Sequence, residues 1–390
     1  MAETKLRVGV IGAGTFAEEA HIPGIQAHPR GQVVALCARN RERAMAMAAR
    51  LGVPDVYTDY HELIARPDID AVTVAAPDAL HAPASIAALE AGKHVFCEKP
   101  LAMTAAEARA MAEAAARAER SGRVAMVGFT FRYSRALQAL RQLLREEALG
   151  TPFYVSMHVH WGGIGYPGHN MTWLEHADQS AGGTWADGAA HLFDALSYIL
   201  APARAVCAQM MIVPRPEGLP QPDSIDLATC LARVSLPGIE GAASSAGTGA
   251  PATPSAFADR EPGTLHATLL TSRVDSPYGT GDEVQVVGTH GAASIALTRG
   301  AHERASLRRA SGGWEDVPLP ADAHTDQPLA LTRMMGAFVD AALRGELGPD
   351  DPSFAAGLQA QEAIEAAIRS AHAARWEGLC AGRSTIAGPR

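Results

Sequence analysis

The stretch LRVGVIGAGTFA, residues 6–17, decides the fold of the first third of the chain. Its first six residues form a β-strand pattern, a glycine-rich turn interrupts it, and an Ala/Glu-rich segment follows, which predicts strand, turn and helix. Gly12 and Gly14 let the backbone approach a pyrophosphate, whose charge the helix N-terminus stabilises. We therefore expect Gly12, Gly14, Thr15 and Phe16 to bind a dinucleotide, although a glycine-rich turn without a ligand would have the same pattern.

Strand and helix patterns continue to alternate through the first 128 residues. Strands are predicted at 6–11, 33–37, 56–57, 71–76, 94–97 and 124–128. Helices are predicted at 41–51, 60–65, 83–91 and 105–121. This alternation implies right-handed crossovers and a parallel sheet covered on both faces. We predict that residues 1–128 form a doubly wound, α/β Rossmann domain.

The pattern changes in the second region, residues 129–390. Strand-like segments follow one another at 152–161, 227–236, 265–274, 283–287 and 293–297, several with apolar/polar alternation. Helices at 329–344 and 354–376 close the chain, and the Gly/Ala/Ser/Pro-rich stretch 237–263 is interpreted as a surface loop. This order predicts an α+β domain with a large, mostly antiparallel open sheet, suited to substrate binding and oligomerisation.

Composition narrows the classes of function. The chain has 390 residues, of which 47% are hydrophobic. It is too long to fold around one ordinary hydrophobic core, so we expect two domains. Its 33 basic residues are scattered among 42 acidic ones, which argues against a nucleic-acid partner. No apolar run approaches the roughly 18 residues that span a bilayer, and no signal-peptide layout is present, so we expect no membrane partner. Its five distant cysteines lack a C-x-x-C pair, which fits reduced thiols in the cytoplasm.

The end of the second predicted strand bears on which dinucleotide binds. The segment Ala38-Arg39-Asn40-Arg41 stands where an Asp or Glu would hold the ribose 2′-hydroxyl of NAD. An arginine can instead pair with the 2′-phosphate of NADP. We therefore favour NADP over NAD, with Ala38 and Arg39 as cofactor contacts. Arg39 could also stack on the adenine or remain solvated.

Further motifs follow the glycine-rich turn in a fixed order. They are PDALH at 77–81, CEKPLA at 97–102, GFTFRY at 128–133, GGTWADGAAHLFD at 182–194 and GTHG at 288–291. Together they resemble the Gfo/Idh/MocA oxidoreductase family, which includes glucose-fructose oxidoreductase and inositol dehydrogenase. The likeness covers nearly the whole chain. It implies a cis Lys99–Pro100 bond, with Pro77 and His81 beside the cofactor and Glu98 near the nicotinamide ribose.

A catalytic group can be argued from chemistry. Hydride loss from a carbinol carbon is easier when the hydroxyl proton leaves, so a base and a cation beside the developing alkoxide are needed. His191 and Lys99 suit these tasks, and Asp187 would lie one helical turn before His191 on the same face. The resemblance assigns the same trio. Taken singly, the three could be a core histidine, a solvated lysine and a helix N-terminal carboxylate.

The substrate contacts are less sharply indicated. The expected set is Lys99, Arg132, Trp161, His176, Asp187 and His191. His158 and His160 would share one side of a strand, but no third ligand has suitable spacing, so no metal is expected. Where relatives often have an aromatic residue followed by Arg, this chain has Trp173-Leu174, so a basic contact is missing.

The leading hypothesis is an NAD(P)-dependent dehydrogenase. It would oxidise a secondary hydroxyl of a sugar, inositol or anhydrosugar, or reduce the matching ketone. One alternative is a non-catalytic cofactor or ligand sensor on the same fold, which would not need the lysine, aspartate and histidine together. Another is an enzyme that holds its cofactor tightly and recycles it internally. We expect a homodimer or homotetramer that covers the open sheet face.

Overall fold

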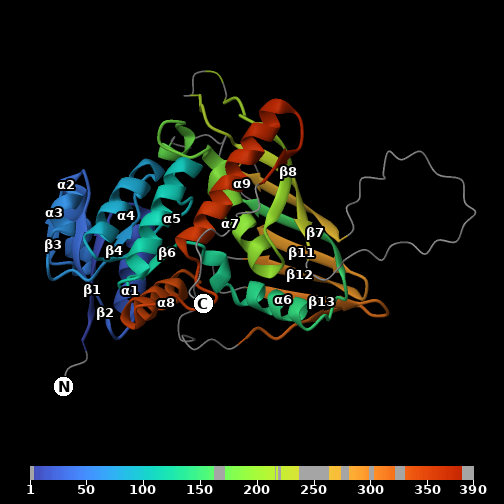
Figure 1. Cartoon of the computed structure of the whole chain (residues 1–390), viewed down its shortest axis with the longest axis horizontal. Coiled ribbons are helices and arrows are strands. Elements are labelled where there is room, and N and C mark those ends of the chain that lie inside the picture. Colours follow the sequence, from blue (N-terminus) through green and yellow to red (C-terminus); the bar gives the residue numbers. More distant parts are fainter. Residues whose placement is uncertain are drawn as a thin grey trace, which may run out of the picture.

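Two β-sheets organise this chain, and helix α9 (Phe354–Ala373) lies between them in the computed structural model (Figure 1). The structure describes residues 4–161, 172–215, 217, 221–236, 263–273, 281–297, 303–320 and 330–379. Apart from Gly263, the loop predicted at 237–263 lies outside the described residues.

The first sheet has six strands, all parallel, in the order β3-β2-β1-β4-β5-β6. Their bounds are β1 (Leu6–Ile11), β2 (Gly31–Cys37), β3 (Asp55–Tyr57), β4 (Ala71–Val74), β5 (His94–Cys97) and β6 (Ala125–Val127). The central strands are short apolar runs, and β4, β5 and β6 are buried at every residue. This is the strand order of a dinucleotide-binding sheet, and it confirms the doubly wound fold.

Helices connect these strands. They are α1 (Ile22–Ala27), α2 (Arg41–Leu51), α3 (Tyr60–Ile64), α4 (His81–Glu90) and α5 (Ala105–Glu119). Side-chain caps set three of their starts: Asn40 accepts from the backbone of Arg43 in α2, Asp59 from that of His61 in α3, and Thr104 with Glu107 forms a capping box in α5. The helix predicted after the first turn is instead a π-helical segment, Ala17–His21, that leads into α1.

The second sheet has nine strands in the order β14-β13-β12-β11-β7-β10-β9-β8-β15. Their bounds are β7 (Pro152–His160), β8 (Ala203–Met211), β9 (Leu227–Ser235), β10 (Thr264–Ser272), β11 (Asp282–Gly288), β12 (Gly291–Leu297), β13 (Arg304–Arg309), β14 (Trp314–Asp316) and β15 (Glu377–Gly378). Only β7 and β10 pair in parallel, so the mostly antiparallel prediction is confirmed.

Four strands of this sheet were not predicted, namely β8, β13, β14 and β15. The sequence of β8, ARAVCAQMM, has one β-branched residue, and β14 and β15 are edge strands of three and two residues. Their place in the sheet comes from pairing with a longer neighbour, which local propensity does not reveal.

Among the described residues, helices cover one face of the second sheet and none covers the other. Helix α6 (Arg135–Arg145) packs on β12 and β13, α7 (Gly183–Ile199) on β7 and β10, and α9 on β8. Side chains alternate accordingly, as in β9, where Cys230 is buried and Leu231 is 41% exposed. We call the uncovered side the open face.

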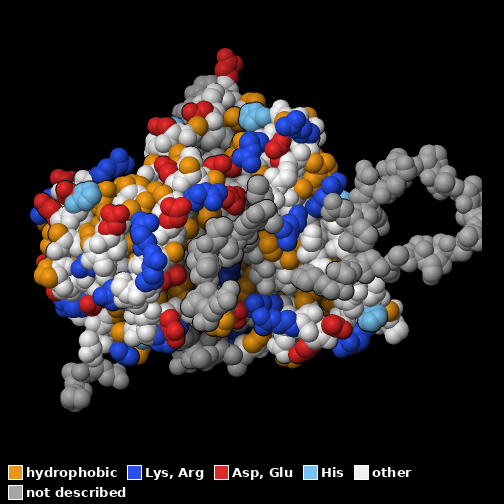
Figure 2. All heavy atoms as spheres, viewed as in Figure 1, with side chains coloured by type: hydrophobic (Ala, Val, Ile, Leu, Met, Phe, Trp, Pro, Cys, Tyr) orange, Lys and Arg blue, Asp and Glu red, His pale blue; other side chains and the backbone are white. Residues whose placement is uncertain are grey.

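The last two helices pack beside the first sheet and between the two sheets, respectively. Helix α8 (Ala330–Arg344) packs against α1 and the core beside the first sheet, and α9 packs against α5, α7 and β8. None of the helices in the described residues is long and apolar enough to cross a membrane. On the face seen in Figure 2, acidic and basic side chains are interspersed.

Candidate active site

The turn after β1 contains two glycines with different surroundings. Gly12 packs against a neighbouring backbone segment, whereas Gly14 faces open space. Gly12 has φ +114°, and a Cβ there would lie 1.9 Å from the carbonyl oxygen of Ala75. At Gly14 a Cβ would meet no atom within 4 Å, so the backbone is accessible. A tight turn with an accessible backbone at the start of a helical segment fits the pyrophosphate of a dinucleotide.

Lys99 follows the end of β5, and its peptide bond to Pro100 is cis, as the family resemblance implied. Its side chain is only 4% exposed, and its Nζ forms an ion pair with Oδ1 of Asp187. The same Nζ lies 5.4 Å from the centre of the Trp161 ring. The fold thus joins two charged groups that are 88 residues apart in the sequence.

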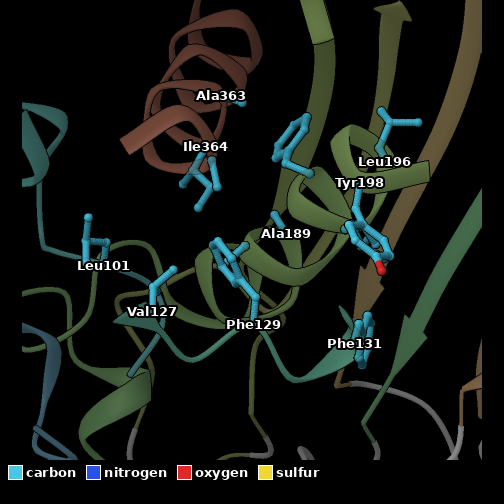
Figure 3. Packing of buried hydrophobic residues seen from close by; sticks show 14 of the residues in the cluster. Leu101, Val127, Phe129, Phe131, Ala189, Leu196, Tyr198, Ala363 and Ile364 are labelled. Carbon is cyan, nitrogen blue, oxygen red and sulfur yellow. The ribbon is translucent and has the colours of Figure 1, made fainter. Parts of the chain in front are cut away.

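His191 lies one helical turn beyond Asp187 on α7, as predicted, and is 4% exposed. Its ring stacks on Phe131 at a centroid distance of 4.5 Å and meets the Trp161 ring at 87°. Phe129 and Phe131 follow β6 and face α7 (Figure 3). His191 is therefore held among aromatic rings that fix its orientation and limit the access of water.

A small pocket adjoins His191. Phe16 from the glycine-rich turn and Phe131 line it, together with Glu303 and Leu331. The pocket thus connects the predicted cofactor turn with the predicted base. Its apolar walls and few polar groups are typical of a small-molecule site.

Glu98 and His21 form a buried pair beside Lys99. His21 Nε2 lies 2.9 Å from Glu98 Oε1, and the Lys99 backbone N–H donates to Glu98 Oε2 at 3.3 Å. A Cβ on Gly128 would come within 2.9 Å of the Glu98 carboxylate, so only glycine leaves room for it. No sequence pattern singles out His21, because one histidine in a helical segment carries no distinctive spacing.

His81 and Asp78 are both buried where β4 meets α4. The ring nitrogens of His81 lie 2.8 and 2.9 Å from the carbonyl oxygens of Pro100 and Ala76, and burial lowers the pKa of the ring. Asp78 is 2% exposed, and burial raises the pKa of its carboxyl to about 8. In the sequence Asp78 is distinguished only as one residue of the PDALH motif, because its burial cannot be seen there.

The remaining predicted residues lie in different surroundings. Arg132 donates to both carboxylate oxygens of Asp194 and to the Asp350 carbonyl, and none of its contacts with described residues involves Lys99, Asp187 or His191. His176 is half-buried after the short helix Trp173–Glu175, and Pro77 and Ala38 are half-buried at their strand ends. Thr15 and Arg39 are exposed. The rings of His158 and His160 are 5.8 Å apart, and the described residues hold no cluster of three metal-ligating side chains.

Two sequence profiles match the chain. The one described as "Oxidoreductase family, NAD-binding Rossmann fold" matches residues 6–129, and the "GFO/IDH/MocA C-terminal domain" matches residues 137–294. The chain belongs to the Gfo/Idh/MocA oxidoreductase family. The resemblance drawn from the motifs is therefore confirmed at the level of the family.

Individual members of the Gfo/Idh/MocA family show how far the likeness extends. The 1,5-anhydro-D-fructose reductase of Ensifer adhaerens is 37% identical over 202 residues, which are 51% of this chain and 59% of that protein. An inositol 2-dehydrogenase of Klebsiella pneumoniae is 39% identical over 148 residues, 38% of this chain and 43% of the relative. The chain thus matches about half the length of these curated relatives.

A solved structure matches over a longer span. A levoglucosan dehydrogenase, in complex with NADH and levoglucosan, superposes with a TM-score of 0.80 at 24% identity, covering 97% of this chain and all of that one. At this level of identity the superposition shows a shared fold.

Proposed function

We propose that this protein is an NAD(P)-dependent oxidoreductase that moves a hydride between nicotinamide and a secondary carbinol carbon of a sugar, inositol or anhydrosugar. The observation that carries the proposal is the joining of Lys99 and Asp187 one helical turn from His191, beside a pocket that Phe16 of the glycine-rich turn also lines. Family membership supports the cofactor class, and the names of the matched relatives support the substrate class.

Each member of the trio has a separate task in the proposed reaction. His191 takes the hydroxyl proton from the alcohol, or returns it to the alkoxide in the reverse direction. The Lys99 ammonium stabilises the negative charge that develops on the substrate oxygen. Asp187 holds that ammonium in place through their ion pair. The bound dinucleotide accepts or supplies the hydride.

The aromatic and buried surroundings strengthen these interactions. Phe131 and Trp161 contact His191, and Lys99 is nearly inaccessible to solvent. A charge acts over a longer range where water is excluded, so a single ammonium stabilises an alkoxide more strongly here than at the surface.

We further propose that NADP is the preferred dinucleotide. Arg39, Arg41 and Arg43 are exposed at the end of β2 and the start of α2, and none forms an ion pair with a described residue. Cations in the first turn of a helix are opposed by the helix dipole, so their presence there favours an anionic ligand such as a 2′-phosphate. In Arg39→Ala we expect the KM for NADP to rise about tenfold and that for NAD to change little.

The first test is an assay of reduced-nicotinamide formation with NAD and with NADP across a panel of sugars, inositols and anhydrosugars. Absorbance growth that depends on one of these polyols supports the proposed activity. Dinucleotide binding without turnover of any polyol would contradict it and would favour the sensor or the enzyme that recycles its cofactor internally. Equal use of both dinucleotides would contradict the preference for NADP.

A further inference from the structure

Asp78 is a buried carboxyl group that the proposed reaction does not use. It begins the short helical turn Asp78–Leu80 after β4. Its Oδ2 accepts a hydrogen bond of 3.0 Å from the backbone N–H of Ala181, while its buried Oδ1 has no hydrogen-bond partner among the described residues. A buried carboxylate with one unsatisfied oxygen is costly, so this environment favours the protonated acid.

The position of Asp78 connects it to the site. Ala181 lies two residues before α7 begins at Gly183, and α7 carries both Asp187 and His191. The Asp78–Ala181 hydrogen bond therefore attaches the entrance of the α7 helix to the end of β4 in the nucleotide-binding sheet. A shift of this helix start would move Asp187 relative to Lys99.

Charged groups on the neighbouring elements influence the ionisation of Asp78. Asp187 of α7 opposes its ionisation and Lys99 beyond β5 favours it, while burial is the largest influence. The thiol of Cys97 in β5 also lies within the field of Asp78, and burial raises its pKa so that it stays neutral. An ionised Asp78 would thus place a second negative charge beside the Lys99–Asp187 pair.

We propose that Asp78 is a positioning residue for this pair: as a neutral acid it fixes the start of α7 and keeps a second negative charge away from the substrate alkoxide. The inference rests on the proposed function for the identity of the reaction. Ionisation of Asp78 adds repulsion against the developing alkoxide without moving any group that touches the substrate.

The pH dependence of turnover tests this inference. In the wild type, kcat for alcohol oxidation should fall about tenfold as the pH rises from 7 to 9.5, because Asp78 becomes charged. Asp78→Asn keeps an acceptor for the Ala181 N–H and cannot ionise, so its kcat should match the wild type at pH 7 and lack this decline. Asp78→Ala loses the acceptor, and its kcat should fall at every pH.

Asp223→Asn is the matched control. Asp223 also accepts a backbone N–H in the segment before α7, from Ala177 at 2.7 Å, but it is exposed. Its substitution should leave the pH profile unchanged. Profiles of the wild type and Asp78→Asn that run parallel would overturn the inference, because a purely structural Asp78 alters kcat equally at all pH values.

Infrared spectroscopy provides a measurement that needs no substrate. The difference spectrum between the wild type and Asp78→Asn should contain a carboxylic-acid carbonyl band at pH 6 that disappears at pH 10. Absence of this band at pH 6 would overturn the inference. If the wild type turned over no polyol, the proposed function would fail, and the infrared titration would still decide whether Asp78 is the neutral acid that the inference requires.

Discussion

The two sheets of this molecule differ in how much of each strand is buried. In the first sheet, strand β4 is buried at all four residues, because helices cover both faces. In the second, strand β9 alternates buried and accessible side chains, because the helices in the described part of the chain cover only one face. Polar chemistry in the first sheet is therefore confined to the strand ends, whereas the second sheet exposes side chains such as Leu231 on the face opposite its helices.

The two ends of strand β5 also differ, as the lysines that flank it show. Lys93 precedes β5 and donates to the carbonyls of Arg66 and Ile69, at 2.8 and 2.7 Å. Lys99 follows β5 and meets the carboxylate of Asp187 from the second sheet's helix layer. Both lysines are buried, yet only the one at the carboxyl end of the strand reaches the site.

The largest expected effect comes from the proposed trio. Lys99→Ala and His191→Ala should each lower kcat/KM at least a hundredfold, because each removes a group that acts on the substrate oxygen or its proton. Lys93→Ala is the control, since it removes a buried lysine from the other end of β5. Near-normal turnover by folded Lys99→Ala would contradict the proposal that the lysine at the carboxyl end of β5 acts in the reaction.

A second test addresses the turn after β1. Gly12→Ala should destabilise the fold by about 2–3 kcal/mol, because its Cβ would clash with the Ala75 carbonyl and its φ is unfavourable for alanine. Gly14→Ala meets no atom and should unfold at nearly the wild-type temperature, while dinucleotide binding weakens. Calorimetry and binding titrations measure the two effects. Equal stability of the two variants would contradict the packing difference.

A third test concerns the cost of burying Asp78. Its pKa in the folded protein is raised from 3.8 to about 8, so the folded state keeps a proton that the unfolded chain releases, and stability is lost as the pH rises through this window. Asp78→Asn does not titrate, so its stability relative to the wild type should rise by on the order of 5 kcal/mol between pH 4 and pH 8. Denaturant unfolding at pH 4 and pH 8 should show that the difference in free energy of unfolding between Asp78→Asn and the wild type grows with pH. A difference that stays constant would contradict this prediction.

The smallest effect on the fold is expected on the open face, which we propose as the surface of self-association. Leu231→Glu, at a side chain 41% exposed, should change the stability of one chain by less than about 0.5 kcal/mol but shift the assembly toward monomer. Met45→Glu, on α2 and 51% exposed, should leave assembly unchanged. Sedimentation equilibrium measures both, and a monomeric wild type at micromolar concentration would contradict the proposal.

Local pattern was sufficient for much of the fold. The alternation of strand and helix patterns predicted α2 and β5 at their observed bounds. The pattern failed where an element depends on a partner. Strand β15 has two residues and exists because Glu377 and Gly378 pair with β8.

The candidate site was predictable to a similar degree. Lys99, Asp187 and His191 could be selected because their motifs occur in a characteristic order, and Asp187 and His191 are one helical turn apart. Arg132 was selected from the GFTFRY motif at the predicted domain junction, and its partner Asp194 is visible only after α7 has packed. His21 and Asp78 carry no spacing signal, because what distinguishes them is burial.

The sequence by itself therefore determined the order of elements, the glycine-rich turn and the identity of the chemically capable side chains. Each of these depends on neighbours within a few residues along the chain. The tertiary structure alone decided which charges meet and which remain neutral, since Lys99 joins Asp187 and Asp78 reaches Ala181 only after two sheets have packed together. Desolvation and pairing act through space, and no local pattern encodes them.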